Sequence, residues 1–407
     1  MEASSLLTAL GPGPAVAVVR DGGRVVVAVE PDEVVVASGP DAFARLDGLR
    51  SGWWAGYLSY DLGRAVERVA PRTVDDLGLP DLVLARFPAR LVLDGATGGA
   101  HLEGGGPGRR RLARALERVP GGAPGPVVLG PGRSSLGRSG YEAGVRTIIA
   151  LIEAGDCYQV NLTRRLTWER PADPVALFAR LQEVNPAPHA ALLHLRGVGD
   201  AGDLAVVSAS PERFLCWRGP AVETRPIKGT AADPAVLAGS AKDRAENVMI
   251  VDLARNDLGR VCEPGSVHVP ALCELEAHPG LHHLVSTVRG RLRPGVGLGG
   301  LLSATFPPAS VTGAPKPRVL QAIEDLEPVR RGVYCGAVGW IDADRGEGDL
   351  AVAIRTFTVL GGRTHLGVGA GIVADSDPAA EWAETELKAA RLLAAASARP
   401  ELATVGA

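Results

Sequence analysis

The sequence predicts a mixed α/β protein, and three patterns support this prediction. Short valine-rich runs separated by Gly, Asp and Pro occupy residues 14–37, as in strands joined by tight turns. Apolar residues recur at helical spacing between residues 139 and 181. From 190 to 374 strand-like and helix-like stretches alternate irregularly. At about 100–200 residues per domain, 407 residues allow two or three domains or one large α/β body.

Residues 1–94 are predicted to be rich in β-structure. After the valine-rich runs, "WWAGYLSYD" (53–61) predicts an aromatic, half-buried strand. Residues 82–95 predict a strand pair interrupted at Pro88, because proline donates no hydrogen bond to a sheet. Residues 95–138 are dominated by Gly, Pro and Arg, which predicts a mobile loop or linker with at most one short helix at 109–118.

Residues 139–400 are predicted to form the second folded region. Ser139 is a candidate N-cap for a helix, residues 157–168 predict a strand, and Asp173-Pro174 predicts the start of a second helix. Residues 240–257 predict a further helix, and the alanine-rich stretch 377–398 predicts a long closing helix.

The composition favours small-molecule chemistry. The chain is 46% hydrophobic and 22% charged with a formal net charge of −3, so no excess of basic charge indicates nucleic acid or an anionic membrane surface as a partner. Five scattered cysteines without a CxxC pair indicate neither a disulfide framework nor a zinc site. The N-terminus has no basic segment before an apolar run, so we expect a cytoplasmic protein that is neither exported nor membrane-spanning.

Two acidic pairs have the spacing of residues on one helical face. Asp243 and Glu246 lie three apart, as do Glu381 and Glu384, and Lys388 follows one turn later. Such pairs are common on solvated helices, which is the simpler interpretation. The alternative is that the two helices face each other and direct carboxylates at one Mg²⁺, which prefers oxygen ligands.

Other candidate residues also have an ordinary alternative. In "RPIKGT", Lys228 follows the apolar residues Pro-Ile and precedes Gly-Thr. It is either a solvated turn residue or a reactive amine. His282 and His283 begin a predicted strand, where neighbours point to opposite faces, so at most one belongs to a given site. Arg355 lies inside an apolar strand-like pattern. Its side chain either reaches the surface or binds a carboxylate.

Two loops are candidates for contact with a ligand. The stretch "ASVTGAPKPRVLQAIEDL" (309–326) leads into a predicted helix, whose backbone N–H groups either bind an anion or are simply capped. Gly369 and Gly371 in "GVGAGIVADSD" allow close approach of a ligand to the backbone.

The order of these motifs resembles that of the chorismate-utilising enzymes, which include the anthranilate, isochorismate, salicylate and aminodeoxychorismate synthases. The resemblance covers residues 140–398 without a gap and is fainter in "GWWAGYLSYDLGR" and "GDCYQVNL". The motifs are "SPERF", "RPIKGT", "KDRAENVMIVDLARNDLGRV", "HHLVSTVRG", "SVTGAPK", "AIRT", "GAGIVADS" and the ExxE helix. The resemblance implies one large α/β body, with two β-sheets packed against each other and helices outside, and a chorismate-binding catalytic region at 139–400.

The resemblance also implies roles for the candidate residues. Glu246 and Glu384 match the ligands of Mg²⁺, which holds the ring carboxylate of chorismate, with Asp243 and Glu381 behind them. His283 matches the active-site histidine of the family. The substrate-binding positions implied by the motifs are Arg355, Lys388, Gly369, Ala370, Gly371, Thr312, Gly313 and Thr230.

Three positions define the expected chemistry. Glu212 of "SPERF" matches the general acid that protonates the departing C4 hydroxyl, a role for which we expect a raised pKa. Anthranilate synthases usually have alanine where this chain has Lys228, and a lysine there is similar to the aminodeoxychorismate synthases, which use it as a covalent nucleophile. Gln159 replaces the lysine base of isochorismate synthases, so addition of water at C2 is disfavoured.

The expected activity is Mg²⁺-dependent amination of chorismate to aminodeoxychorismate by a synthase component I, for p-aminobenzoate and folate synthesis. No glutaminase nucleophile motif occurs, so the ammonia is expected from a separate glutamine amidotransferase subunit. An anthranilate synthase component I is the alternative activity, and a catalytically dead chorismate-binding scaffold is a third. Ala309 and Trp340 depart from the usual family residues and affect the expected shape of the pocket.

Overall fold

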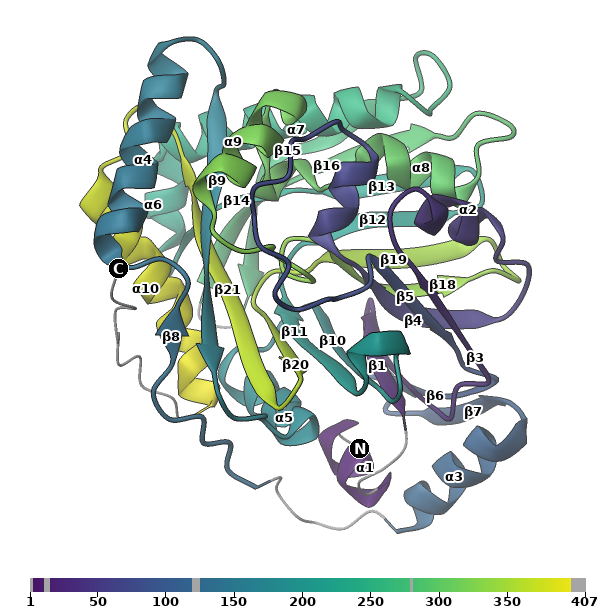
Figure 1. The fold of residues 1–407 in the computed structure, drawn as a ribbon. Helices are drawn as coiled ribbons and strands as arrows, with labels where there is room; N and C mark the ends of the chain where they lie inside the picture. The colour runs from purple at the N-terminus through teal and green to yellow at the C-terminus, as the bar shows by residue number, and fades with distance from the viewer. Residues whose placement is uncertain (1–2, 11–14, 119–124, 279–280, 397–407) are drawn as a thin grey trace.

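Two large antiparallel β-sheets form the centre of the molecule (Figure 1). The computed structural model describes residues 3–10, 15–118, 125–278 and 281–396. Every pairing between named strands within these ranges is antiparallel. The expected architecture of two packed sheets with helices outside is confirmed.

Sheet A has strands from both halves of the chain. Its order is β17 (Gly313–Ala314), β9 (Gln159–Trp168), β21 (Arg363–Ile372), β20 (Thr356–Leu360), β11 (Leu204–Ser210), β10 (His189–Leu195), β1 (Val16–Asp21), β2 (Arg24–Val29), β6 (Ala89–Asp94) and β7 (Ala100–Gly104), with β8 (Arg133–Ser134) also pairing with β9.

Sheet B has the same mixed origin. Its order is β14 (Ile227–Ala231), β16 (Leu281–Arg291), β13 (Ala221–Arg225), β12 (Arg213–Arg218), β19 (Glu347–Val352), β18 (Ala337–Asp342), β4 (Trp53–Leu58), β5 (Leu82–Arg86) and β3 (Glu33–Ala37), with β15 (His268–His278) also pairing with β16.

Helices cover the outer faces of both sheets (Figure 1). Around sheet A lie α1 (Ala3–Leu10), α3 (Gly106–Glu117), α4 (Arg138–Glu153), α5 (Pro174–Val184), α9 (Lys316–Leu326) and α10 (Pro378–Ala395). Around sheet B lie α2 (Asp41–Asp47), α6 (Pro234–Gly239), α7 (Ala241–Gly259) and α8 (Leu298–Thr305). The 3₁₀ helices of the described ranges are η1 (Tyr60–Ala65), η2 (Gly199–Ala201) and η3 (Ala309–Val311).

The core between the sheets is built from alternate residues of the facing strands. Val19 and Val26 of sheet A belong to one buried cluster with Tyr57 and Trp340 of sheet B. Trp340 stacks on Trp53 with ring centroids 6.4 Å apart. Trp340 is therefore part of the inter-sheet core.

Several local predictions are confirmed. Asp173 caps α5 by accepting a hydrogen bond from the Ala176 amide, and Pro174 is its first residue. The predicted helices at 240–257 and 377–398 correspond to α7 and α10, although residues 397 and 398 lie outside the described ranges. None of the described helices is long and apolar enough to cross a membrane.

Other local predictions were wrong in whole or in part, because tertiary packing decided them. Ser139 lies within α4, whose N-cap is Gly137 in an extended conformation. Strand β4 is buried on both faces because the second sheet covers one face and helices the other. The two strands predicted at 82–95 on either side of Pro88 are confirmed as β5 and β6, but they belong to different sheets, because the chain crosses between the sheets at Phe87-Pro88.

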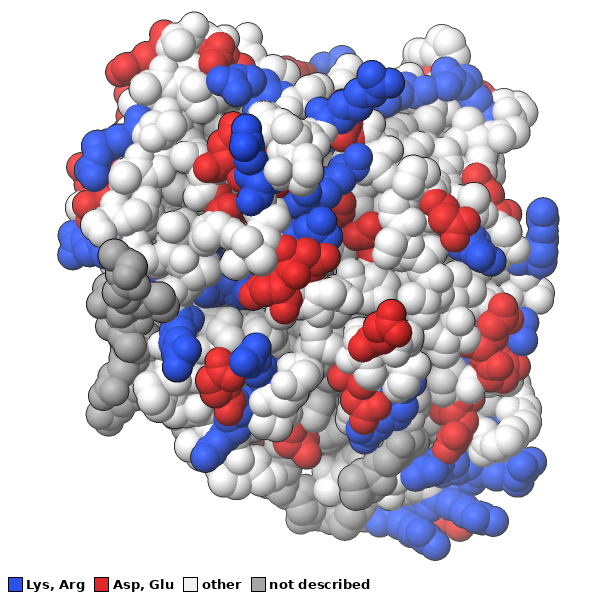
Figure 2. Space-filling model, in the orientation of Figure 1, with Lys and Arg blue, Asp and Glu red and all other residues white. Residues whose placement is uncertain are grey.

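Residues 95–138 contain more regular structure than their composition predicts. Strand β7 pairs with β6, and α3 buries Leu112 and Ala115 against the outer face of sheet A. Figure 2 shows Lys and Arg side chains gathered over α3, which carries the sequence RRRLAR, while both signs of charge are mixed elsewhere on this face.

Candidate active site

The predicted site residues come together where the β14–β16 edge of sheet B meets the β9–β21 edge of sheet A (Figure 1). Lys228 and Thr230 lie on β14, His283 on β16, and Gly369, Ala370 and Gly371 on β21. Helix α7 packs against β14 and β16, and α10 packs against β21, so the two acidic helices flank this junction. The sequence pattern alone did not determine that these segments meet.

Lys228 points its amine across this junction at sheet A. A Cβ atom on Gly371 would lie 3.4 Å from Lys228 Nζ and 3.0 Å from Gln159 Nε2, so the glycine leaves room for both groups. Gly229 has φ +74°, which places the chain beside Asp243 and favours glycine. Burial lowers the pKa of the Lys228 amine, Glu246 opposes that shift, and Lys388 adds to it. A lowered pKa increases the fraction of neutral, nucleophilic amine.

Gln159 is fully buried, and neither polar atom of its amide has a hydrogen-bond partner in the described structure. A buried amide without a partner costs free energy, so this group is suited to bind a ligand beside Lys228.

Glu212 follows β11 and is only 4% exposed. Burial raises the pKa of its carboxyl to about 7, against the opposing effects of a hydrogen bond from Ser310 and the positive charge of Lys228. The direction agrees with the expectation for a general acid. Ser310 was missed by the sequence analysis, where it was only one polar residue of the "SVTGAPK" loop.

The adjacent histidines separate as strand geometry requires. His283 is 2% exposed, and its Nδ1 lies 2.8 Å from Thr230 Oγ1. His282 faces the other way, with its Nδ1 3.2 Å from Ala232 O. The Thr230 hydroxyl therefore contacts His283 and orients its ring.

The four acidic residues lie on the two helices that flank the junction, and their charges influence one another. Burial raises the pKa of Glu246, and Asp243 and Glu384 raise it further, while Lys228 lowers it. Glu381 accepts a 2.6 Å hydrogen bond from Ser376, but its other carboxylate oxygen is buried without a partner. Carboxylates that raise one another's pKa favour a cation between them.

These residues fit an Mg²⁺ ion that is bound jointly by protein carboxylates, water and substrate, and not one whose ligands all come from the protein. Within the described ranges, no group of three or more His, Cys, Asp or Glu side chains is placed to hold a metal ion by itself. Mg²⁺ commonly takes one or two protein carboxylates and completes its shell with water and substrate oxygens. The orphaned oxygen of Glu381 and the oxygen-only donor set agree with that arrangement.

The predicted carboxylate-binding cations have contacts of their own. Lys388 Nζ lies 2.6 Å from Glu384 and donates to Gly369 O at 3.0 Å, so it bridges α10 to β21. Arg355 lies at the crossover from β19 of sheet B to β20 of sheet A, outside the strand in which the sequence pattern placed it. Its φ of +51° is unusual for a residue with a side chain.

In the loop before α9, Thr312 forms hydrogen bonds to other residues of the same loop, whereas the resemblance implied a contact with the substrate. Thr312 is fully buried, its hydroxyl donates to Pro308 O at 3.1 Å, and its amide donates to Ala309 O at 3.3 Å. Gly313 has φ +132°, and a Cβ there would lie 1.9 Å from Gln159 O, so glycine is required for this loop to reach β9. Thr312 and Gly313 therefore form a wall of the junction.

Glu212 lines a cavity of about 30 Å³. Its lining includes Ala309, Ser310, Thr305 and Asp257, and its size suits about one water molecule. Ala309, one of the two departures from the usual family residues, therefore shapes a small space next to Glu212.

The sequence is similar to those of known proteins. The model of the chorismate binding enzyme family matches residues 10–394. The chain is 42% identical over 348 residues to aminodeoxychorismate synthase component 1 from Klebsiella aerogenes, covering 83% of this chain and 76% of the relative. It is 40% identical over 365 residues to anthranilate synthase component 1 from Thermus thermophilus, covering 84% and 77%.

Solved structures share the fold. The crystal structure of anthranilate synthase component I from Streptococcus pneumoniae TIGR4 has a TM-score of 0.76 at 30% identity and covers 93% of this chain and 90% of its own. The menaquinone-specific isochorismate synthase from Escherichia coli has a TM-score of 0.75 at 20% identity, covering 97% and 91%, which is evidence for the fold alone.

Proposed function

Because the chain belongs to the family of chorismate-binding enzymes, we propose that it is the chorismate-using component of an aminodeoxychorismate synthase. The observation that carries the proposal is Lys228, whose amine faces Gly371 and Gln159 in the junction. A relative with the name aminodeoxychorismate synthase component 1 is 42% identical to the chain. The proposed reaction replaces the C4 hydroxyl of chorismate by an amino group and releases water.

In the first step the neutral amine of Lys228 attacks C2 of chorismate. The C2–N bond forms, both double bonds of the ring shift by one position toward C4, and the C4–O bond breaks. Glu212 is the carboxyl that gives its proton to the departing hydroxyl, which leaves as water. Its raised pKa of about 7 keeps a large protonated fraction available near neutral pH.

In the second step ammonia attacks C4, both ring double bonds shift back, and the C2–N bond to Lys228 breaks. The proton lost by the incoming nitrogen balances the proton that Glu212 supplied. Two displacements allow amination at the carbon that carried the hydroxyl with overall retention of configuration. Gln159 has no acidic or basic group, so it does not activate water for attack at C2.

The remaining residues bind and orient the substrate. Glu246 and Glu384, with Asp243 and Glu381 behind them, would hold Mg²⁺, which supplies positive charge for the ring carboxylate. We assign the second carboxylate to Arg355, Lys388 and the backbone of β21 and of the loop before α9. His283, held by Thr230, closes the sheet B side of the site.

Ammonia is proposed to come from a separate glutamine amidotransferase subunit. The names of the relatives, which end in "component 1", describe one part of a two-component enzyme. The chain itself would then use ammonium salts but not glutamine.

Anthranilate synthase is the second candidate, because a relative with that name is 40% identical over a similar length. The two activities differ in their product, so incubation of the purified chain with chorismate, Mg²⁺ and an ammonium salt, followed by chromatography, distinguishes them. Aminodeoxychorismate supports the proposal and anthranilate refutes it. Unchanged chorismate would favour a binding protein without activity.

A further inference from the structure

A buried ion pair between Glu327 and Arg331 lies beside the candidate site and has no part in the proposed chemistry. We infer that this pair is a positioning device, which holds β9 and the loop before β17 in the arrangement that chorismate binding requires. The inference depends on the proposed function only in taking this junction as the chorismate site.

The two side chains form a two-point contact that is closed to solvent. Arg331 Nε donates to Glu327 Oε2 at 2.9 Å, and Nη2 donates to Glu327 Oε1 at 2.6 Å. Arg331 is 6% exposed and Glu327 5% exposed. The ring of Tyr60 covers the guanidinium with 4.4 Å between the Arg331 Cζ atom and the ring centroid.

The remaining hydrogen bonds of the pair go to backbone atoms of site segments. Arg331 donates to Asn161 O at 2.6 Å and to Val311 O at 2.9 Å, and Glu327 Oε1 accepts from the Thr163 amide at 2.8 Å. The pair therefore binds strand β9 at two positions and the η3 loop at a third.

These three positions adjoin the residues assigned to the substrate. In the β9–β21 register, Asn161 is opposite Gly371 and Thr163 is opposite Gly369. Val311 immediately precedes Thr312, and the Asn161 amide donates to Thr312 O at 2.8 Å. Movement of the ion pair would shift β9, and with it the glycine backbone of β21 and the wall at Thr312.

A role in stability alone does not explain why both residues are charged. Burying a carboxylate and a guanidinium is costly, and replacing such pairs by apolar residues is often neutral or stabilising. An apolar pair would leave the carbonyls of Asn161 and Val311 without donors, and only a planar guanidinium serves both while also pairing with a carboxylate. The charge pair therefore specifies the geometry of the junction.

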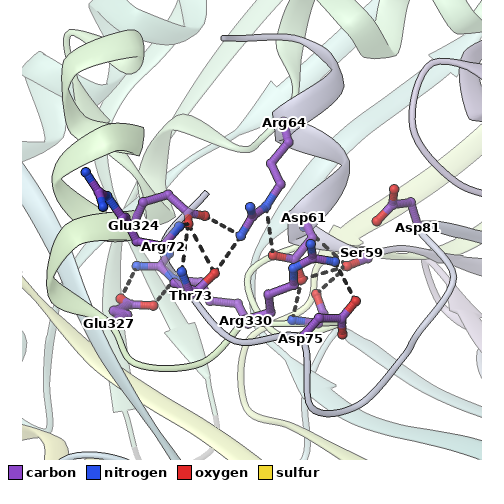
Figure 3. A network of polar contacts seen from close by, with 12 residues as sticks. Ser59, Asp61, Arg64, Arg72, Thr73, Asp75, Asp81, Glu324, Glu327 and Arg330 are labelled. Carbon is purple, nitrogen blue, oxygen red and sulfur yellow. Dashed lines mark hydrogen bonds and ion pairs between the residues drawn. The ribbon is translucent and has the colours of Figure 1, made fainter. Parts of the chain in front are cut away.

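A second ion pair, formed by Glu324 three residues before Glu327, is a matched control. Glu324 of α9 pairs with Arg64 and accepts from the amide of Thr73 at 3.1 Å (Figure 3). Figure 3 shows Glu324 directed toward Arg64 and Thr73, with Glu327 nearby. Among the described residues, the hydrogen bonds and ion pairs of the control pair reach Asp61, Arg72 and Thr73, and none reaches β9 or the η3 loop.

The experiment compares Arg331→Met/Glu327→Leu with Arg64→Met/Glu324→Leu. Urea unfolding measures stability, and titration calorimetry measures the dissociation constant for chorismate in the presence of Mg²⁺. We expect the Arg331 double variant to bind chorismate at least tenfold more weakly than the wild type and the control variant to bind within about threefold, at comparable loss of stability. Equal loss of affinity in both variants, or wild-type affinity in the Arg331 variant, would overturn the inference.

The single variant Arg331→Lys covers the case in which the double variant does not fold. Lysine keeps the charge but cannot make the planar two-point contact and reach both carbonyls. We expect near wild-type stability with weakened chorismate binding, and unchanged affinity overturns the inference. A chain that binds chorismate but produces anthranilate refutes the proposed function and leaves this comparison valid, because the readout is binding.

Discussion

Replacing the buried carboxyl Glu212 by glutamine is expected to stabilise the protein while abolishing its activity. Burial raises the pKa of Glu212 from its ordinary 4.5 to about 7. A carboxyl with a raised pKa stays protonated in the folded state while the unfolded state ionises, so the folded state binds more protons between these values. Stability from this group is therefore fully present below pH 4.5 and is lost as the pH rises to about 7.

The magnitude follows from the shift. At 1.36 kcal/mol per pKa unit, a shift from 4.5 to about 7 corresponds to about 3 kcal/mol at pH 8. Glutamine has nearly the same shape and does not ionise, so Glu212→Gln escapes this cost. In a chain of 407 residues, about 3 kcal/mol raises the unfolding temperature by about 3 °C.

Urea unfolding of wild type and variant from pH 4 to 8.5, without substrate or metal, measures the effect. The difference in unfolding free energy is expected to be constant near pH 4, to rise between pH 4.5 and 7, and to level off above. Glu169→Gln is the control, because Glu169 is about half exposed in its pair with Arg363, and its difference is expected to change little. A difference for Glu212→Gln that stays flat with pH would show an ordinary carboxylate and would refute Glu212 as the acid.

Three further predictions concern catalysis. Glu246→Gln or Glu384→Gln is expected to abolish turnover and the Mg²⁺-dependent part of chorismate binding. Calorimetry with and without the metal measures the binding, and a Mg²⁺ dependence that persists in both variants contradicts the metal assignment. Product formation from ammonium salts is expected to increase with pH as free ammonia increases, and glutamine-dependent product from the purified chain alone would contradict the separate glutaminase. Lys228→Ala is expected to lower aminodeoxychorismate formation by at least about a hundredfold, the scale of losing a nucleophile, while chorismate still binds. Mass spectrometry of wild type quenched with chorismate and no ammonia is expected to show an adduct on the Lys228 peptide, and absence of the adduct together with near wild-type rates in Lys228→Ala would exclude covalent catalysis.

Local chemistry accounts for the parts of the structure that the sequence predicted. Asp173 and Pro174 begin α5 because a cap and a fixed φ act within one helical turn. The valine-rich runs separated by turn residues identify β1, β2 and β3, because the pattern of a strand is visible within a few consecutive residues. Lys228 was identified by its motif, which is also a local property.

Only the tertiary structure decided which segments share a sheet and which side chains meet. Strands β5 and β6 are separated by two residues and belong to different sheets, and Arg355 lies at a crossover between sheets that its neighbours do not predict. Burial in the folded chain raises the pKa of Glu212, and Ser310 and Lys228, which come from other segments, oppose that shift. Burial and charge proximity depend on contacts between distant residues, so a sequence pattern of a few residues does not contain them. The Glu327–Arg331 pair is the strongest case, because its i,i+4 spacing is ordinary and its partners on β9 and η3 are about 170 and 20 residues away.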